Sequence, residues 1–192
     1  MLKILDDFLS DKEKDAVENF FISSRCNWSF RSMTSGPDAT FFGAGTELES
    51  IQFVNHCYSY NGLQNGVMDP ESFKFVHSVV KAYQEELNFQ IKNINRIKTN
   101  CTIKNIDFKD KHHPAHVDIL NEDHYTMIYY INDSDGPTRF FSDDGRILDE
   151  VDPKKGRAVL FKSNQLHAGT CPVKNDIRLV SNIVFQSYRT LI

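Results

Sequence analysis

The spacing of apolar residues along the chain predicts two helices in the N-terminal half and a series of strands after them. Ser10-Asp11-Lys12-Glu13 has the form of a capping box, and apolar residues follow it at helical spacing, so residues 11–23 are predicted to form an amphipathic helix. Asp69-Pro70-Glu71 marks the start of a second helix, which should run to about Asn88. Residues 24–68 lie between the two and are rich in Gly, Asn and Pro turns.

From residue 91 onward the pattern changes to the two-residue period of β-strands. One predicted strand has two faces, with Arg96, Lys98, Asn100 and Thr102 on one and Ile97, Thr99, Cys101 and Ile103 on the other. Further strands are predicted at residues 116–120, 125–132, 138–141, 147–151, 157–162 and 177–188, with Asp-, Gly- and Pro-rich turns between them. Many short strands after two helices predict a mainly β fold, a jelly roll with supporting α-helices.

Composition narrows the class of protein. The chain has 192 residues, of which 40% are hydrophobic and 25% charged, which is typical of one globular domain spanning residues 1–192. No apolar run approaches the length of a membrane span, and the N-terminus lacks the apolar core of a signal peptide, so we expect a soluble, cytoplasmic protein. The four cysteines are scattered, which favours free thiols over disulfides.

A net charge of −4 disfavours sequence-independent binding of nucleic acid, although a protein with this net charge can still have a local basic cleft.

Two histidines and one aspartate are candidate metal ligands. His116 and Asp118 are two residues apart, so on an extended strand their side chains point to the same face. His167 begins another strand-like run, which ends in Arg178. Two imidazoles and one carboxylate, with open positions opposite, suit a non-haem Fe(II) oxygenase. A lone His-x-Asp is a weak signal, and the alternative is a surface histidine pair beside a solvated aspartate.

The ordered set of motifs resembles the catalytic core of the 2-oxoglutarate/Fe(II)-dependent dioxygenases of the prolyl-4-hydroxylase type. The matching segments are residues 116–118, 126–132, 136–141, 153–161 and 166–170, followed by Arg178. The resemblance implies a double-stranded β-helix, the cupin-like jelly roll, with His116, Asp118 and His167 as iron ligands. It also implies Fe(II) as the metal, 2-oxoglutarate and O₂ as cosubstrates, and ascorbate as a candidate reductant.

The resemblance further implies a cation for the distal carboxylate of 2-oxoglutarate. Arg178 follows His167 by eleven residues, and its planar guanidinium suits two-point recognition of a carboxylate. Asn182 shares its strand face, and on the neighbouring strand Thr126 and Tyr130 share a face. The candidate cosubstrate-binding residues are therefore Arg178, Tyr130, Thr126 and Asn182. Tyr129 points to the opposite face and is predicted to pack in the core.

Residues 31–68 are a candidate substrate lid, because a reactive metal site needs shielding from water and this stretch combines five glycines with aromatic residues. The candidates for substrate contact are Tyr60 in the lid and, on strand faces, Arg96, Asn100 and Arg139; each of the last three could equally be a solvated strand residue.

Three other histidines lie close to the motif in sequence. Pro114 favours an extended backbone at His113, which should place it at the rim of the site. We expect His112, His113 and His124 to be exposed or in contact with substrate rather than to bind iron.

The function that best fits is hydroxylation of a C–H bond in an amino-acid-like or peptidyl, for example prolyl, substrate, with release of succinate and CO₂. A nucleic-acid demethylase of the alkylation-repair type is an alternative, disfavoured by the acidic balance and by the lack of an Arg/Lys-rich lid with aromatic residues. A non-enzymatic jelly-roll binding module is another, disfavoured because the set of His116, Asp118, His167 and Arg178 is intact.

Overall fold

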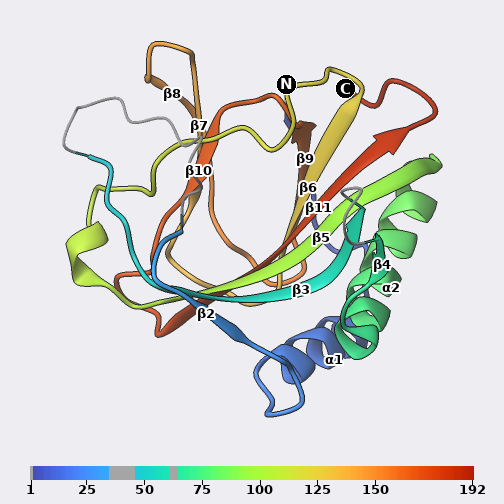
Figure 1. Cartoon of the computed structure of the whole chain (residues 1–192), viewed down its shortest axis with the longest axis horizontal. Coiled ribbons are helices and arrows are strands. Elements are labelled where there is room, and N and C mark those ends of the chain that lie inside the picture. Colours follow the sequence, from blue (N-terminus) through green and yellow to red (C-terminus); the bar gives the residue numbers. More distant parts are fainter. Residues whose placement is uncertain (1, 35–45, 61–64) are drawn as a thin grey trace.

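A curved antiparallel β-sheet is the main element of the computed structural model, which describes residues 2–34, 46–60 and 65–192 (Figure 1). In spatial order its strands are β1 (Lys3–Leu5), β9 (Ala158–Lys162), β6 (His124–Tyr130), β11 (Ile177–Ser187), β5 (Ile91–Ile103), β3 (Gln52–Tyr60) and β2 (Ser29–Arg31), with β4 (Asn65–Val67) also paired to β3. A smaller sheet faces it, with the strand order β10 (His167–Gly169), β7 (Thr138–Phe141) and β8 (Ile147–Val151). This is the predicted mainly β architecture, the double-stranded β-helix.

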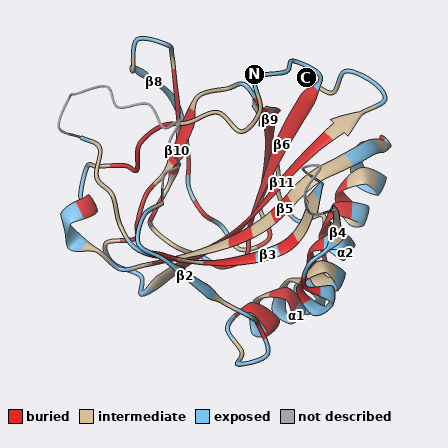
Figure 2. Ribbon diagram, viewed as in Figure 1, coloured by how far each residue is buried: buried red, intermediate tan, exposed pale blue. Residues whose placement is uncertain are grey.

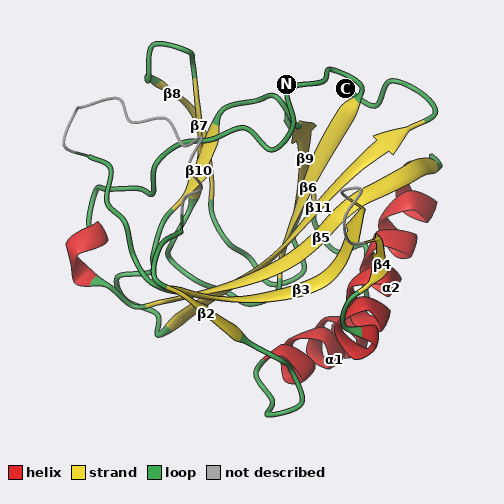
Figure 3. Ribbon diagram, viewed as in Figure 1, coloured by secondary structure: helices red, strands yellow, loops and turns green. Residues whose placement is uncertain are grey.

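Two helices cover the outer face of the larger sheet (Figures 1 and 3). The side chains of α1 (Asp11–Phe21) and α2 (Pro70–Leu87) form the larger hydrophobic core with alternate residues of the strands, among them Tyr129 of β6, as predicted. The next residue, Tyr130, lies on the inner face and belongs to a second core between the two sheets. Figure 2 shows the buried strands, such as β6, that lie between these two hydrophobic cores.

Local signals account for both helices. The Ser10 hydroxyl accepts the N–H of Glu13, and the Glu13 carboxylate accepts the Ser10 N–H at 2.8 Å, which is the predicted capping box. The α1 helix ends at Phe21, two residues earlier than predicted. The Asp69 carboxylate caps α2, and Asn88 ends it in the left-handed conformation at φ 47°.

The predicted lid is wrong over residues 52–60. These residues form β3, a nine-residue strand between β2 and β5 in the larger sheet. Tyr58 packs against Phe73 of α2, with ring centroids 5.8 Å apart. Residues 65–67 form β4, whereas residues 35–45 and 61–64 of the predicted lid lie outside the described residues.

The predicted strand at residues 116–120 is also wrong, since only His116 pairs, in a single bridge to His167.

Two further expectations concern the chain as a whole. Cys26, Cys57, Cys101 and Cys171 are free thiols, as predicted. Among the helices in the described ranges, α1 and α2 included, none has the length and apolar character needed to span a membrane.

Candidate metal and cosubstrate site

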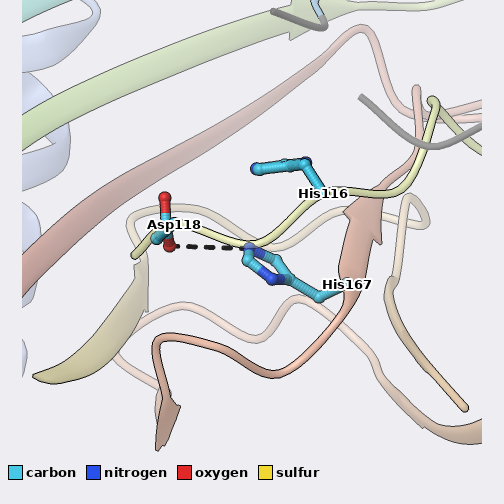
Figure 4. A group of neighbouring side chains, drawn as sticks. All are labelled: His116, Asp118 and His167. Carbon is cyan, nitrogen blue, oxygen red and sulfur yellow. Dashed lines mark ion pairs between the residues drawn. The ribbon is translucent and has the colours of Figure 1, made fainter. Parts of the chain in front are cut away.

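His116, Asp118 and His167 come together next to β10 (Figure 4). His116 and His167 exchange two backbone hydrogen bonds, of 2.9 and 3.0 Å, which align the motif segment with β10. The N–H of Asp118 donates to the carbonyl of Ser163, just after β9, at 2.9 Å. Each residue offers one ligand atom, and these three atoms lie within 4.8 Å of one another.

Both imidazoles are held in the neutral form that binds metal. Nδ1–H of His167 donates to the carbonyl of Gln165 at 2.9 Å, so its Nε2 carries a lone pair. That Nε2 is buried, lies 3.7 Å from Oδ2 of Asp118, and has no hydrogen-bond partner among the described residues. Burial lowers the pKa of His167 and lowers that of His116 to about 3.

Asp118 is held as a carboxylate. Burial alone would raise its pKa, but the Arg96 guanidinium and the two imidazoles outweigh that effect and lower it. Arg96 forms an ion pair with Oδ1, and the Thr126 hydroxyl donates to Oδ2 at 2.8 Å. A buried, unpartnered Nε2 beside an ionised carboxylate is the kind of donor set that a divalent metal completes, so these residues fit Fe(II).

Arg178 lies buried on the inner face of β11 and is fixed by neutral groups. Its Nε donates to the carbonyl of Gly136, and its Nη2 donates to the Thr138 hydroxyl at 2.8 Å. The guanidinium carbon sits 5.6 Å from the centre of the Tyr130 ring. A Cβ on Gly169 would come 3.5 Å from Nη1, so the glycine leaves open the space beside this nitrogen.

One cavity connects the metal ligands to Arg178. It has an empty volume of about 590 Å³, its open mouth included. His116 and His167 line it together with Arg178, and the larger sheet adds the polar side chains of Lys98, Asn100, Thr102 and Asn182. A small ligand in this space can therefore reach the metal position with one end and Arg178 with the other.

The other predicted cosubstrate residues divide into two groups. Asn182 lines the cavity. Tyr130 instead supports Arg178 from behind, since its hydroxyl donates to Thr138 at 2.8 Å and to the carbonyl of Val151 at 3.3 Å. Thr126 touches Asp118 rather than the cavity.

Of the four predicted substrate residues, three lie at the cavity or beside Asp118 and one lies away from both. Asn100 lines the cavity, and Arg96 reaches Asp118 from the same strand. Tyr60 is exposed and lines a neighbouring hollow with Arg96 and Asp118. Arg139 points away from the cavity. It lies on the face of β7 opposite to Phe140, whose ring stacks on His167, and it pairs with Glu150 at 2.7 Å.

For the three further histidines, predicted to be exposed or in contact with substrate, exposure is wrong and contact with substrate stays a prediction. His112, His113 and His124 are all buried, and none belongs to the metal group found among the described residues. His113 lines the cavity, and its pKa is lowered to about 3 by burial. Its Nδ1–H donates to the carbonyl of Leu48 at 3.2 Å.

Lys98 is a charged cavity residue that was not among the predicted site residues. It lies between Arg96 and Asn100 on the same strand face, so the two-residue period already placed it with them. The alternation along the strand therefore indicated its position, but a lysine on a strand is ordinarily solvated, so it was not predicted as a site residue.

A jelly roll in which one cavity joins a His-x-Asp…His group to a buried arginine has the architecture of a 2-oxoglutarate/Fe(II) oxygenase. The comparisons agree: residues 101–186 match the family model described as the 2OG-Fe(II) oxygenase superfamily. The matched segment contains His116, Asp118, His167 and Arg178, and the match indicates an oxidoreductase; the matched family uses Fe(II) and 2-oxoglutarate. No curated protein is significantly similar in sequence.

Solved structures share the fold at low sequence identity. A prolyl-4-hydroxylase from Pseudomonas putida is 15% identical with a TM-score of 0.54, and the alignment covers 96% of this chain and 92% of that one. A 2OG-Fe(II) oxygenase family protein from Burkholderia pseudomallei is 13% identical with a TM-score of 0.66, covering 98% and 86%. A Trichoplax adhaerens prolyl hydroxylase, in complex with a hypoxia inducible factor peptide fragment, is 15% identical with a TM-score of 0.59, covering 97% and 83%.

Proposed function

We propose that the protein is a 2-oxoglutarate- and Fe(II)-dependent hydroxylase of an amino-acid-like or peptidyl substrate, prolyl substrates included. The observation that carries the proposal is the single cavity that joins His116 and His167 to the buried Arg178. A dicarboxylate that chelates a metal at one end needs a fixed cation at the other, and Arg178 supplies one.

In this proposal His116, Asp118 and His167 hold Fe(II), and Arg178 binds the distal carboxylate of 2-oxoglutarate. Bound Fe(II) with 2-oxoglutarate and O₂ supplies the oxidising power that hydroxylates a C–H bond and releases succinate and CO₂. Thr126 and Arg96 orient the Asp118 carboxylate, and Gln165 orients the His167 ring.

Aromatic side chains shield the His167 side of the metal position. The Phe161 ring packs against His167 with centroids 4.7 Å apart, and Phe140 stacks on the same imidazole at 6.2 Å. Exclusion of water protects a reactive centre from side reactions and strengthens the charge interactions of Asp118 and Arg178.

Two of the solved structures with this fold support the choice of an amino-acid-like or peptidyl substrate. The protein from Pseudomonas putida is a prolyl-4-hydroxylase, and the one from Trichoplax adhaerens holds a peptide fragment. The acidic balance of this chain, with a net charge of −4, argues against a nucleic-acid substrate.

The test is an anaerobic titration of the protein with Fe(II) and then 2-oxoglutarate, followed by a succinate-release screen over free amino acids and short peptides. We expect the visible absorption of an Fe(II)–2-oxoglutarate chelate and succinate release that depends on substrate. Asp118→Ala is the control that should lose both while keeping its circular dichroism spectrum. A folded wild-type protein that binds neither Fe(II) nor 2-oxoglutarate would overturn the proposal.

A further inference from the structure

Three cations and a histidine lie near one another on β2, β3 and β5, beside the cavity. We call this set the basic cluster: Arg31, His56, Arg96 and Lys98. These strands lie side by side in Figure 1 and come from three separate parts of the chain.

The strand register places the cluster on the cavity side. Residues directly opposite each other in an antiparallel pair point to the same face. Lys98 of β5 lines the cavity, and His56 of β3 is its direct partner. Arg31 of β2 lies opposite Gln52, which also lines the cavity. The register therefore puts these residues on the face of the sheet that carries the cavity, where Lys98 is half-buried, whereas His56 and Arg31 are exposed.

The charges of the cluster are not balanced by the protein. Arg96 pairs with Asp118, but within residues 2–34, 46–60 and 65–192 no acidic side chain forms an ion pair with Lys98 or Arg31. Burial and the neighbouring Arg96 lower the pKa of Lys98 to about 8, so its ammonium is still charged at neutral pH. Partial burial and the cations Lys98, Arg31 and Arg96 lower the pKa of His56.

Neutral polar groups flank the same lysine. Asn100 follows Lys98 on its strand face, and Asn182 of β11 is the direct partner of Lys98 on the other side. The side-chain oxygens of both asparagines are buried and have no hydrogen-bond partner among the described residues. An amide and an ammonium together can surround an anion with donors, because an asparagine can turn its N–H groups towards it.

Bound 2-oxoglutarate would leave the positive charge of Lys98 and Arg31 unpaired. If the proposed function holds, one carboxylate of 2-oxoglutarate meets the metal and the other meets Arg178, while Asp118 is shared between the metal and Arg96. Lys98 then remains without an ion-pair partner in a half-buried place, where an unpaired charge is costly, and the exposed Arg31 adds positive charge nearby. An anionic group brought by the substrate would offset that cost.

We propose that the substrate is a small anionic molecule or chain end whose carboxylate, or an equivalent phosphate, binds between Lys98 and Arg31. This inference rests on the proposed function and specifies its substrate class. For an amino-acid-like substrate the group is the free α-carboxylate, so internal residues of a peptide are excluded.

The experiment compares free acids with their neutral counterparts on the Fe(II)-loaded enzyme. Each free amino acid and dipeptide is paired with its carboxamide, and phosphoserine and phosphorylated peptides form a third arm; succinate release is measured. We expect release to be stimulated by at least one free acid with a KM at least about tenfold lower than that of its amide. Stronger stimulation by the third arm supports the same cluster as a phosphate site.

Variants test the residues themselves. Lys98→Met and Arg31→Gln should raise the KM for the substrate about tenfold to a hundredfold and leave the KM for 2-oxoglutarate within twofold. Lys98→Arg, which keeps the charge, should recover part of the loss, and thermal unfolding shows that the variants are folded. Lys92→Met is the matched control, because Lys92 is exposed on the same strand and lines no part of the cavity.

Two results would overturn the inference. One is succinate release that is equal for free acids and their amides and is not raised by the phosphorylated compounds, the absence of stimulation by all three arms included. The other is a Lys98→Met variant whose defect lies in the KM for 2-oxoglutarate, because Lys98 would then belong to the cosubstrate site. Either result leaves the proposed function standing, since Fe(II) and 2-oxoglutarate binding are measured separately.

Discussion

Arg178 and the residues around it show how single side chains determine what the cavity can bind. The guanidinium is buried, and its hydrogen bonds within the described chain go to the neutral oxygens of Gly136 and Thr138. Burial lowers the pKa of Arg178, but a guanidinium ionises so readily that it stays charged. A buried cation without a carboxylate partner is therefore available to an anionic ligand.

We expect Arg178→Ala to weaken 2-oxoglutarate binding by about two orders of magnitude or more, since loss of one partner of a buried charged pair costs on the order of 3–5 kcal/mol. Fe(II) binding should survive, because the metal ligands are other residues. Anaerobic titration measures both affinities. Arg139→Ala is the control, as that arginine pairs with Glu150 outside the cavity. An unchanged 2-oxoglutarate affinity in Arg178→Ala would remove this residue from the site.

Two glycines beside Arg178 should differ in their tolerance of alanine. A Cβ on Gly136 would lie 2.8 Å from the backbone oxygen of Thr170 and 2.9 Å from Cδ of Arg178, which is too close for either neighbour. Gly136→Ala should therefore lower the free energy of unfolding by about 1–3 kcal/mol, the usual cost of overpacking. A Cβ on Gly169 makes only ordinary contact at 3.5 Å, so Gly169→Ala should unfold like the wild type in urea. Equal stability of the two variants would contradict this packing argument.

At the scale of elements, the site depends on β5 and β11, whose inner faces carry the cavity residues, and on α2, which holds the outer face of β3 and β5. The start of α2 is joined to the sheet through one side chain. The Asp69 carboxylate accepts the N–H of Ser72 at 3.2 Å and the amide of Asn55, from β3, at 2.8 Å. The helix cap is thereby also a contact between the layers.

Asp69→Ala should lower the free energy of unfolding by about 2–4 kcal/mol, the sum of a lost N-cap and a buried amide left without its acceptor. The measurement is urea unfolding at pH 7. Glu71→Ala is the control in the same helical turn, because its pairing with Arg25 is exposed and should matter by less than about 1 kcal/mol.

Asp69 should also make the free energy of unfolding depend on pH. Burial alone would raise the pKa of Asp69, but hydrogen bonds from Asn55 and Ser72 outweigh it and lower the pKa. A lowered folded-state pKa means that the stabilisation is fully present above the unfolded value of about 3.9 and is lost as the pH falls through the lower folded value. The difference between wild type and Asp69→Ala should therefore shrink in acid. A difference that stays constant down to the lowest pH at which the protein folds would contradict this assignment.

The whole molecule brings its metal ligands together from two distant segments, so metal binding should stabilise the entire fold. His116 and Asp118 precede β6, whereas His167 begins β10, and unfolding separates them. A ligand that binds only the folded state at about 100 times its Kd adds about 2.7 kcal/mol. We expect Mn(II), a redox-stable stand-in for Fe(II), to raise Tm by on the order of 5–10 °C.

Scanning fluorimetry with and without Mn(II) measures this shift. Asp118→Ala should abolish it, and His77→Ala, which changes an exposed helical histidine, should keep it. A shift of equal size in Asp118→Ala would place the metal elsewhere.

Local signals in the sequence determined much of the fold and the metal group. A capping box, a proline at the start of a helix and the alternation along β5 act through neighbours in the chain, so they can be recognised without a structure. The spacing of His116 and Asp118 is likewise local. Only the pairing of His167 with His116, across two backbone hydrogen bonds, required the fold.

The sequence separated the two faces of β5 and β6, whereas only the tertiary structure decided which face of β7 lines the cavity. Arg139 and Arg178 both lie on predicted strands, yet β7 turns Arg139 away from the cavity towards Glu150, whereas β11 buries Arg178 beside the cavity. Residues 52–60 form a long strand because β5 and β2 supply partners on both sides, and His113 is buried because residues 46–50 cover it. Lys98 became a binding candidate only when Arg31 and His56 were found beside it. Such contacts join residues far apart in the chain, so no short pattern in the sequence records them.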